Sequence, residues 1–290
     1  MTLPAVGALR ERWPEARIEV LGYPHIAELA LSRPYADAIR SIEASALAGF
    51  FIPGGVLAPE WMEYMGSFHL VVSYLYDPDG IFAANVKRCG VKQFVQGSPQ
   101  PTDCPAAQHY CRPLESLAIY VTEPQPRVLP DEAGSMVAER LLAGRPRERL
   151  AVIHPGSGGE KKNWDTGKFG RLGRWLVDEC GAQLLVVKGE ADEVPVRRLM
   201  QHLAPGEFSL LQGLKLKELA AVLRYARVFV GNDSGITHLA AAVGTRTVAL
   251  FGPHSPGIWE PRGSQVRVVR FGEDDEERAQ RAVADCWKGG

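Results

Sequence analysis

The segment Val228–Pro253 constrains the fold of this chain more than any other. An apolar strand at 228–230 runs into the polar turn Gly-Asn-Asp-Ser-Gly at 231–235, and the helix that follows ends at Gly244. A second apolar strand then covers 247–251. The pattern predicts a strand–turn–helix–strand unit, whose helix N-terminus offers unpaired N–H groups and the positive end of a dipole. Such a terminus is a natural seat for phosphate.

The residue types of this turn suit an anion site. Gly235 has no Cβ, so a bulky anion can approach the backbone, and Asp233 or Ser234 can cap the helix. Ser234 and His238 are four residues apart and share one helix face. Because an ionised Asp233 pointing inward would repel phosphate, we expect it to accept backbone N–H groups instead. On physical grounds alone, a capped turn with His238 facing the core is the commoner arrangement.

The run from Gly231 through His238 and Gly244 to Pro253 resembles the signature of glycosyltransferase family 9, the ADP-heptose:lipopolysaccharide heptosyltransferases. The match is long and nearly unbroken. In that family the run binds the nucleotide diphosphate of the sugar donor. The resemblance therefore implies that Asp233, Ser234, Gly235 and His238 lie at a diphosphate site.

A second polar loop covers 154–164, between a buried strand and a helix. Gly156 and Ser157 belong to a Gly-Ser-Gly-Gly turn, whose backbone N–H groups can form an anion-binding nest. The loop matches neither the Walker A pattern nor G-x-G-x-x-G. It is similar to the family's other phosphate loop, which implies that Ser157 touches phosphate, Lys162 pairs with it and Trp164 starts the helix. A flexible loop with solvated lysines is the alternative.

Two further strand ends suggest contacts to the rest of a nucleotide. Glu190 follows a third strand and could bind ribose hydroxyls, although helix capping explains it equally well. Gly213 and Leu214 follow a fourth strand and could form the floor of a base pocket. A diphosphate held by two loops, a lysine and a histidine needs no metal ion, so we expect neither a metal nor another cofactor.

Strands and helices alternate along almost the whole chain of 290 residues, which predicts parallel sheets wound on both sides. Three prolines at 122–130 mark a linker. We predict two Rossmann-like domains, 1–125 and 126–290, in the architecture called GT-B, with a final helix after 273–277 that could pack back on the N-terminal domain. The first half is expected to contain helices at 3–13, 25–32, 79–89 and 106–119, and strands at 17–21, 38–42, 68–74 (fully buried) and 92–95.

Composition excludes several classes of protein. Net charge is −1, which gives no reason to expect nucleic-acid binding. No apolar run reaches the roughly 18 residues that span a bilayer. The five cysteines are scattered without a C-x-x-C pair, so zinc and redox motifs are not expected. We interpret them as reduced thiols in a cytoplasmic protein.

The beginning of the chain bears on catalysis. Family members open with a strand and a Gly-Asp loop, and the helix that follows resembles Thr2–Pro14 of this chain. The aspartate of that loop is the family's proposed general base. The resemblance thus implies that the catalytic residue lies before residue 1, that no residue here inherits its role, and that the N-terminal domain lacks its first strand. The neighbours of that strand would be unpaired.

The sequence therefore predicts an inverting glycosyltransferase that moves heptose from an ADP-sugar to a lipopolysaccharide core or related glycolipid. Two alternatives stay open: a non-catalytic nucleotide-sugar-binding homologue, and a GT-B enzyme with another nucleotide-sugar or acceptor. Because the implied acceptor is anchored in a membrane, we also expect peripheral contact at the inner face of the inner membrane. The basic residues that could make this contact are Arg10, Arg12, Arg17, Lys87 and Arg88.

Overall fold

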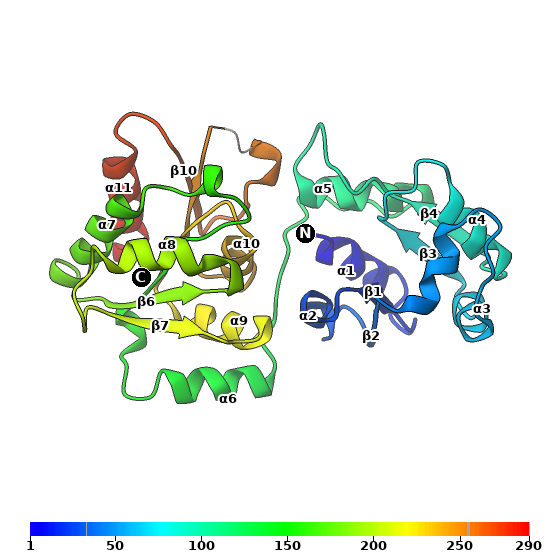
Figure 1. Cartoon of the computed structure of the whole chain (residues 1–290), viewed down its shortest axis with the longest axis horizontal. Helices are drawn as coiled ribbons and strands as arrows, with labels where there is room; N and C mark the ends of the chain where they lie inside the picture. The colour runs from blue at the N-terminus through cyan, green and yellow to red at the C-terminus, as the bar shows by residue number, and fades with distance from the viewer. Residues whose placement is uncertain (33, 254–255, 290) are drawn as a thin grey trace. The chain divides into compact units, whose positions relative to one another are not determined.

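The chain divides into two compact units, Met1–Pro126 and Arg127–Gly290 (Figure 1). The structure is a computed structural model that describes residues 1–32, 34–253 and 256–289. The division falls inside the proline-bearing segment 122–130, where the sequence placed a boundary after residue 125. Within the described residues, none of the helices has both the length and the apolar character that crossing a bilayer demands.

The C-terminal unit is built on one parallel sheet of six strands, in the order β10-β9-β8-β5-β6-β7. The two middle strands are buried along their whole length, as expected for parallel strands covered on both faces. Strand order reverses between β5 and β8, which are paired with His154 opposite Gly231. This is the doubly wound topology that the alternating pattern predicted. The strands are β5 (Leu150–His154), β6 (Gln183–Lys188), β7 (Phe208–Gln212), β8 (Val228–Asn232), β9 (Thr247–Phe251) and β10 (Val266–Arg270).

Helices cover both faces of this sheet. On one face, α7, α8 and α11 contribute apolar side chains to a core with β5, β6, β8 and β9. On the other, α10 packs on β8 and β9, α9 packs on α10, and α6 packs on α9. The helices are α6 (Glu132–Leu141), α7 (Thr166–Asp178), α8 (Glu193–Met200), α9 (Leu216–Tyr225), α10 (Gly235–Ala242) and α11 (Asp275–Lys288).

The final helix, α11, packs on the sheet of its own unit. We expected that it could pack back on the N-terminal domain. Ala279, Val283 and Cys286 are buried in the core beneath β8, β9 and β10, and packing of the rest of the helix on the N-terminal domain stays a prediction. Their spacing along one helix face gives α11 an apolar stripe, and the C-terminal sheet buries that stripe.

The N-terminal unit holds two separate parallel sheets of two strands each within the described residues, β1 with β2 and β3 with β4. Within the described part of the chain, no strand of one pair is hydrogen-bonded to a strand of the other. The helix α1 shares an apolar cluster with Val20 of β1 and another with Val72 of β3. The elements are α1 (Leu3–Arg12), β1 (Glu19–Gly22), α2 (Pro24–Ala27), β2 (Ala38–Ser41), α3 (Pro59–Gly66), β3 (Leu70–Ser73), α4 (Ile81–Arg88), β4 (Gln93–Gln96) and α5 (Ala106–Cys111).

Two expectations for this unit were wrong in detail, and one helix was not predicted. The helix expected at 106–119 stops at Cys111 and continues as a 3-10 turn, Arg112–Leu117. The reason is Pro113, which has no N–H for an α-helical hydrogen bond. The strand β3 is half-buried rather than fully buried, because it lies in a sheet of only two strands. The helix α3 was not predicted, although Pro59 marks its first turn.

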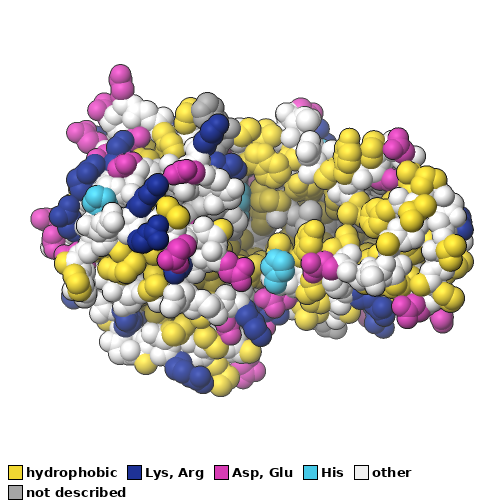
Figure 2. All heavy atoms as spheres, viewed as in Figure 1, with side chains coloured by type: hydrophobic (Ala, Val, Ile, Leu, Met, Phe, Trp, Pro, Cys, Tyr) yellow, Lys and Arg dark blue, Asp and Glu magenta, His cyan; other side chains and the backbone are white. Residues whose placement is uncertain are grey.

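The basic residues expected at a membrane surface are largely occupied within the unit. Arg10 forms an ion pair with Asp37 at 2.6 Å, and Arg88 donates to the carbonyl of Gly55 at 3.0 Å. On the face seen in Figure 2, apolar side chains gather on this unit, and several large ones are exposed. Among them, the loop 51–56 has the most exposed member, Val56, which is 93% exposed.

Candidate functional site

The two polar loops identified in the sequence follow β5 and β8, the strands between which the sheet order reverses. In open α/β sheets, the carboxyl ends of the strands at this switch point form the crevice that binds ligands. The sequence therefore placed both loops at the same edge of the sheet, and the structure brings them into contact.

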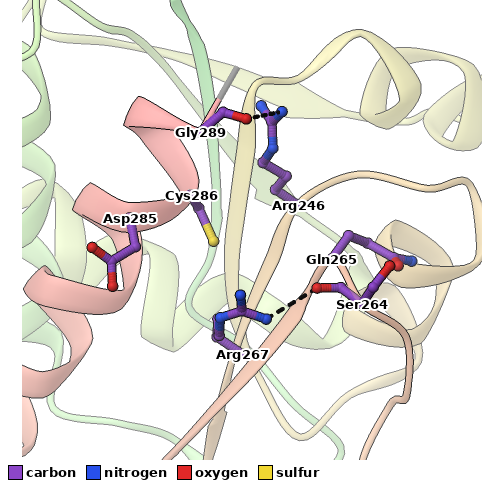
Figure 3. A pocket seen from close by; sticks show the side chains of 7 residues that line it. All are labelled: Arg246, Ser264, Gln265, Arg267, Asp285, Cys286 and Gly289. Carbon is purple, nitrogen blue, oxygen red and sulfur yellow. Dashed lines mark hydrogen bonds between the residues drawn. The ribbon is translucent and has the colours of Figure 1, made fainter.

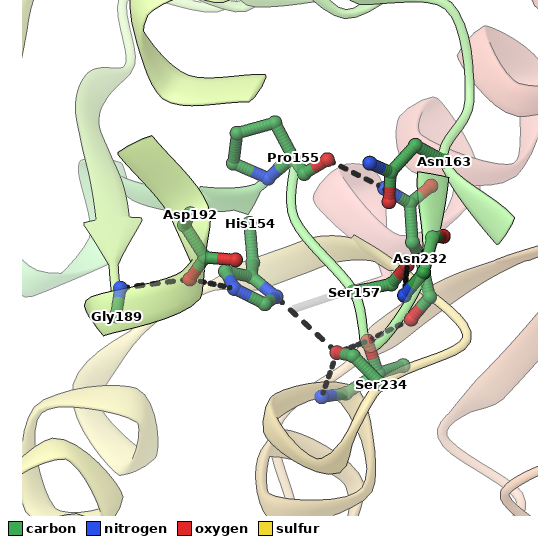
Figure 4. A network of polar contacts seen from close by, with 10 residues as sticks. His154, Pro155, Ser157, Asn163, Gly189, Asp192, Asn232 and Ser234 are labelled. Carbon is green, nitrogen blue, oxygen red and sulfur yellow. Dashed lines mark hydrogen bonds and ion pairs between the residues drawn. The ribbon is translucent and has the colours of Figure 1, made fainter. Parts of the chain in front are cut away.

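Asn232, the last residue of β8, ties the two loops together (Figure 4). Its Oδ1 accepts a hydrogen bond from the N–H of Trp164 at 2.9 Å, and its Nδ2 donates to the carbonyl of Pro155 at 2.8 Å. The Asn232 side chain is fully buried. Thr237 Oγ1 also donates to the Asn232 carbonyl, which fixes the first turn of α10 on the strand end. The sequence analysis had not singled out Asn232.

A buried chain of polar contacts lies beneath the same edge. His154 Nε2 lies 2.9 Å from Asp192 Oδ2, and His154 Nδ1 lies 3.2 Å from Ser234 Oγ (Figure 4). His154 and Asp192 are 2% and 6% exposed. Burial alone would raise the pKa of Asp192, but the hydrogen bond from His154 and the N–H of Gly189 hold this pKa below its ordinary value. An ionised Asp192 requires a proton on His154 Nε2.

This tautomer decides what Ser234 can do. When only Nε2 of His154 carries a proton, Nδ1 accepts a hydrogen bond, so the Ser234 hydroxyl donates to it. The same Ser234 oxygen accepts from the N–H of Thr237 at 3.3 Å and so caps α10. The N–H groups of Gly235 and Ile236 form no hydrogen bond with other described backbone groups. Open space also lies where a Cβ of Gly235 would stand.

Lys162 and Asp233 form an ion pair across the two loops, with Nζ 2.9 Å from Oδ2. The Asp233 side chain is 6% exposed and that of Lys162 is 45% exposed. Our expectation that Asp233 accepts backbone N–H groups was therefore wrong. A buried carboxylate needs a partner, and the lysine of the other loop supplies it.

His238 lies in the first turn of α10, one turn after Ser234. Burial lowers the pKa of His238 to about 4, and the charge of Lys162 acts in the same direction while that of Asp233 opposes it. Both charges belong to the two loops, so His238 lies at the same edge of the sheet. It is neutral near pH 7 and presents one N–H donor.

The remaining candidate residues make fewer contacts with the two polar loops. Ser157 Oγ donates to the carbonyl of Gly159 at 2.8 Å, so the hydroxyl closes its own turn. Glu190 is exposed, and the carboxylate that reaches the loops is that of Asp192, two residues later. Gly213 has a φ of 70°, a conformation that suits glycine in the turn after β7, and Leu214 beside it is half-buried. The sequence analysis did not single out Asp192; the signal that could have found it is a carboxylate three residues after Gly189, just past the end of β6.

A cavity of about 150 Å³ lies at the opposite edge of the same sheet (Figure 3). It lies near the residues that precede β9 and β10 and the end of α11. Arg246 donates to the carbonyl of Gly289 at 2.7 Å, and Arg267 donates to that of Ser264 at 3.0 Å. These arginines therefore satisfy backbone groups at the amino edge, away from the two polar loops.

Comparison with known proteins agrees with this architecture. Residues 99–288 match the model of glycosyltransferase family 9 (heptosyltransferase). The glycosyl transferase family 9 protein from Veillonella parvula has a TM-score of 0.82 at 17% identity, with 100% of this chain and 93% of that chain covered. The structure of E. coli heptosyltransferase WaaC with ADP has a TM-score of 0.68 at 18% identity, with 98% and 95% covered.

Among curated sequences, lipopolysaccharide heptosyltransferase 3 of E. coli K12 is 24% identical over 285 residues, which cover 90% of this chain and 81% of that protein. Four heptosyltransferases 2 match at 24% to 29% identity, but the chain spans only 33% to 48% of their length. The fold is that of the two-domain GT-B proteins. Because the family model covers well over half of its length, the chain belongs to glycosyltransferase family 9.

The contact between Gly156 and Asp192 gives a prediction about the site. A Cβ on Gly156 would stand 1.7 Å from Asp192 Oδ1, so Gly156→Ala must push Asp192 away from His154. We expect this substitution to lower the free energy of unfolding by about 1–3 kcal/mol, as overpacking does. Chemical denaturation measures the change.

The matched control is Gly158→Ala in the same loop, because no atom lies within 4 Å of the added Cβ. Its stability should stay within about 0.5 kcal/mol of the parent protein. Equal losses of stability for the two substitutions would show that the close approach of Gly156 to Asp192 does not determine which residues the loop accepts.

Proposed function

We propose that the C-terminal unit binds the diphosphate of an ADP-sugar, and that the protein transfers heptose from this donor to a lipopolysaccharide core or related glycolipid. The observation that carries the proposal is the junction of the two polar loops at the switch point of the sheet. There, the helix N-terminus of α10 and the Lys162 side chain lie on loops that Asn232 holds together. Family membership supports the same class of reaction.

The proposed roles follow from what each group has available. The N–H groups of Gly235 and Ile236 would donate to phosphate oxygens at the positive end of α10. Ser234 would order this helix start, since its hydroxyl already faces His154. Lys162 would donate a hydrogen bond to a diphosphate oxygen while it stays beside Asp233, and His238 would donate one hydrogen bond. Gly156 and Ser157 would shape the facing turn.

These groups suit the departure of the nucleotide. In an inverting transfer, an acceptor oxygen forms a bond to the anomeric carbon while the bond from this carbon to the β-phosphate oxygen breaks. The acceptor proton goes to a base, and negative charge grows on the departing ADP. Fixed N–H donors and a lysine stabilise such charge most when it has developed. The C-terminal unit would thus assist the leaving group.

The ribose and base would lie over the next strand ends. Glu190, Gly213 and Leu214 remain our candidates for these contacts, because β6 and β7 end at the same edge of the sheet as β5. The acceptor would be a membrane-anchored glycolipid met at the cytoplasmic face of the inner membrane. Since Arg10 and Arg88 are occupied, the exposed apolar loop 51–56 is the better candidate for peripheral contact.

Binding of ADP in the absence of divalent metal tests the proposal. We expect titration calorimetry of the full chain in EDTA to show one ADP site, because two loops and a lysine compensate the diphosphate without a metal. The same titration with UDP and with GDP tests the alternative of a different nucleotide-sugar, which predicts that one of these nucleotides binds more tightly than ADP. Affinity that appears only with added magnesium would refute the proposed site.

Replacement of Lys162 should weaken diphosphate binding specifically. A hydrogen bond to a charged group contributes about 1.5–3 kcal/mol, so Lys162→Ala should reduce ADP affinity by about ten- to a hundredfold. The neighbouring exposed Lys161→Ala is the matched control and should bind as the parent does. AMP, which lacks the second phosphate, should lose less affinity than ADP. If the two lysine variants behave alike, Lys162 does not contact the diphosphate.

Affinity for ADP should depend on pH through His238. Burial keeps its pKa at about 4 without ligand, and a bound anion favours the charged imidazolium, so the pKa rises on binding. Protons are then taken up with ADP, and affinity increases as the pH falls from about 8 towards about 5. His238→Gln should flatten this part of the profile, whereas protonation of ADP itself is common to both proteins. If ADP affinity depends on pH in the same way in both proteins and the variant is less stable, His238 is a core residue that does not contact the ligand.

A further inference from the structure

A cluster of three metal-ligating side chains lies in the N-terminal unit, apart from the residues of the proposed donor site. Asp103, Cys104 and His109 each offer one ligand atom, and these atoms all lie within 4.8 Å of one another. Cys104 is a free cysteine and is 8% exposed. Asp103 and Cys104 end the loop between β4 and α5, and His109 lies within α5.

The protonation state of His109 is set by its surroundings. Its Nε2 lies 2.9 Å from the carbonyl oxygen of Ser98, which can only accept, so Nε2 must carry the proton. In the neutral imidazole, the other ring nitrogen, Nδ1, then has a free lone pair. It is buried and has no hydrogen-bond partner among the described residues. A buried acceptor without a partner costs about 1–3 kcal/mol, and a metal ion would remove that cost.

The contacts around the cluster match those of known metal sites. Histidines that bind metals usually donate their other N–H to a carbonyl or carboxylate, as His109 does to Ser98. Ligating carboxylates are themselves held by hydrogen bonds, and Arg112 donates to both oxygens of Asp103 at 2.8 and 2.7 Å. Arg112 would keep its place beside the carboxylate while one of these oxygens turned to the metal.

The donor set selects the metal. A thiolate, an imidazole and a carboxylate are the ligands of zinc, whereas magnesium and calcium take oxygen alone. With zinc distances of about 2.3 Å to sulfur and 2.0–2.2 Å to nitrogen and oxygen, the ligand atoms must approach one another to less than about 4 Å. The loop before α5 must close by about 1 Å to achieve this.

We propose that Asp103, Cys104 and His109 bind a zinc ion, with water in the fourth position, and so fasten the loop 98–105 to α5. Asp103, Cys104 and His109 do not form a complete common zinc motif, which is why the sequence did not indicate the site. The proposal is independent of the proposed donor site, which lies in the other unit and uses no metal.

Metal titration of the full chain tests the proposal. After treatment with chelator and desalting under reducing conditions, we expect one equivalent of Zn²⁺ to compete with a chromophoric chelator. Co²⁺ should give the absorption of a thiolate-bound, four-coordinate ion. Cys104→Ser and His109→Gln should each lower zinc affinity at least about tenfold, since even outer-shell changes cost about 10- to 100-fold. Cys104→Ser should also abolish the thiolate band.

Cys180→Ser is the control, because Cys180 is a half-buried free cysteine of the other unit and should leave both signals unchanged. Asp103→Asn should weaken binding while the thiolate band remains. Circular dichroism and melting curves without metal establish that each variant folds. If Cys104→Ser does not fold, His109→Gln provides the test. A stoichiometry well below one, or full zinc affinity in His109→Gln, would overturn the proposal.

Discussion

The buried amide of Asn232 is the interaction on which the C-terminal edge of the sheet depends. It satisfies the N–H of Trp164 and the carbonyl of Pro155, two backbone groups of a loop about seventy residues earlier in the chain. Because each unsatisfied buried group costs about 1–3 kcal/mol, the two loops are held in one relative position before any ligand arrives. Preorganisation of this kind lowers the entropy cost of binding.

The two buried aspartates beside the α10 helix start illustrate how such a site tolerates negative charge. Asp192 accepts from His154 and from the N–H of Gly189, and Asp233 pairs with Lys162. Each carboxylate thus has a hydrogen-bond or ion-pair partner within the protein. The positive end of the α10 dipole remains available to an external anion, since neither carboxylate caps the helix; Ser234 does.

The fold of the C-terminal half could be predicted because its strands are continuous apolar runs and parallel strands must place their carboxyl ends at one edge. That rule predicted that Ser157, Lys162 and Ser234 lie at the same edge of the sheet. It could not reveal the partner of Asp233, because Lys162 reaches it from another loop, nor the role of Asp192, whose contact requires the close approach at Gly156. In the first half, α3 was missed because the segment before it lacks clear periodicity. The strands of this half lie in sheets of only two strands and are only partly buried, so their sequences are less apolar and harder to recognise.

The Lys162–Asp233 ion pair has a consequence for the rate at which a nucleotide arrives. A lysine whose charge is already matched by a carboxylate 2.9 Å away produces little field beyond the site. At the proposed site, long-range attraction of a diphosphate by this pair would therefore be small, whereas uncompensated charge that lines a cleft accelerates association. Association is then governed by orientation rather than steering, and changes little with ionic strength. Discrimination between nucleotides rests on how long each one stays.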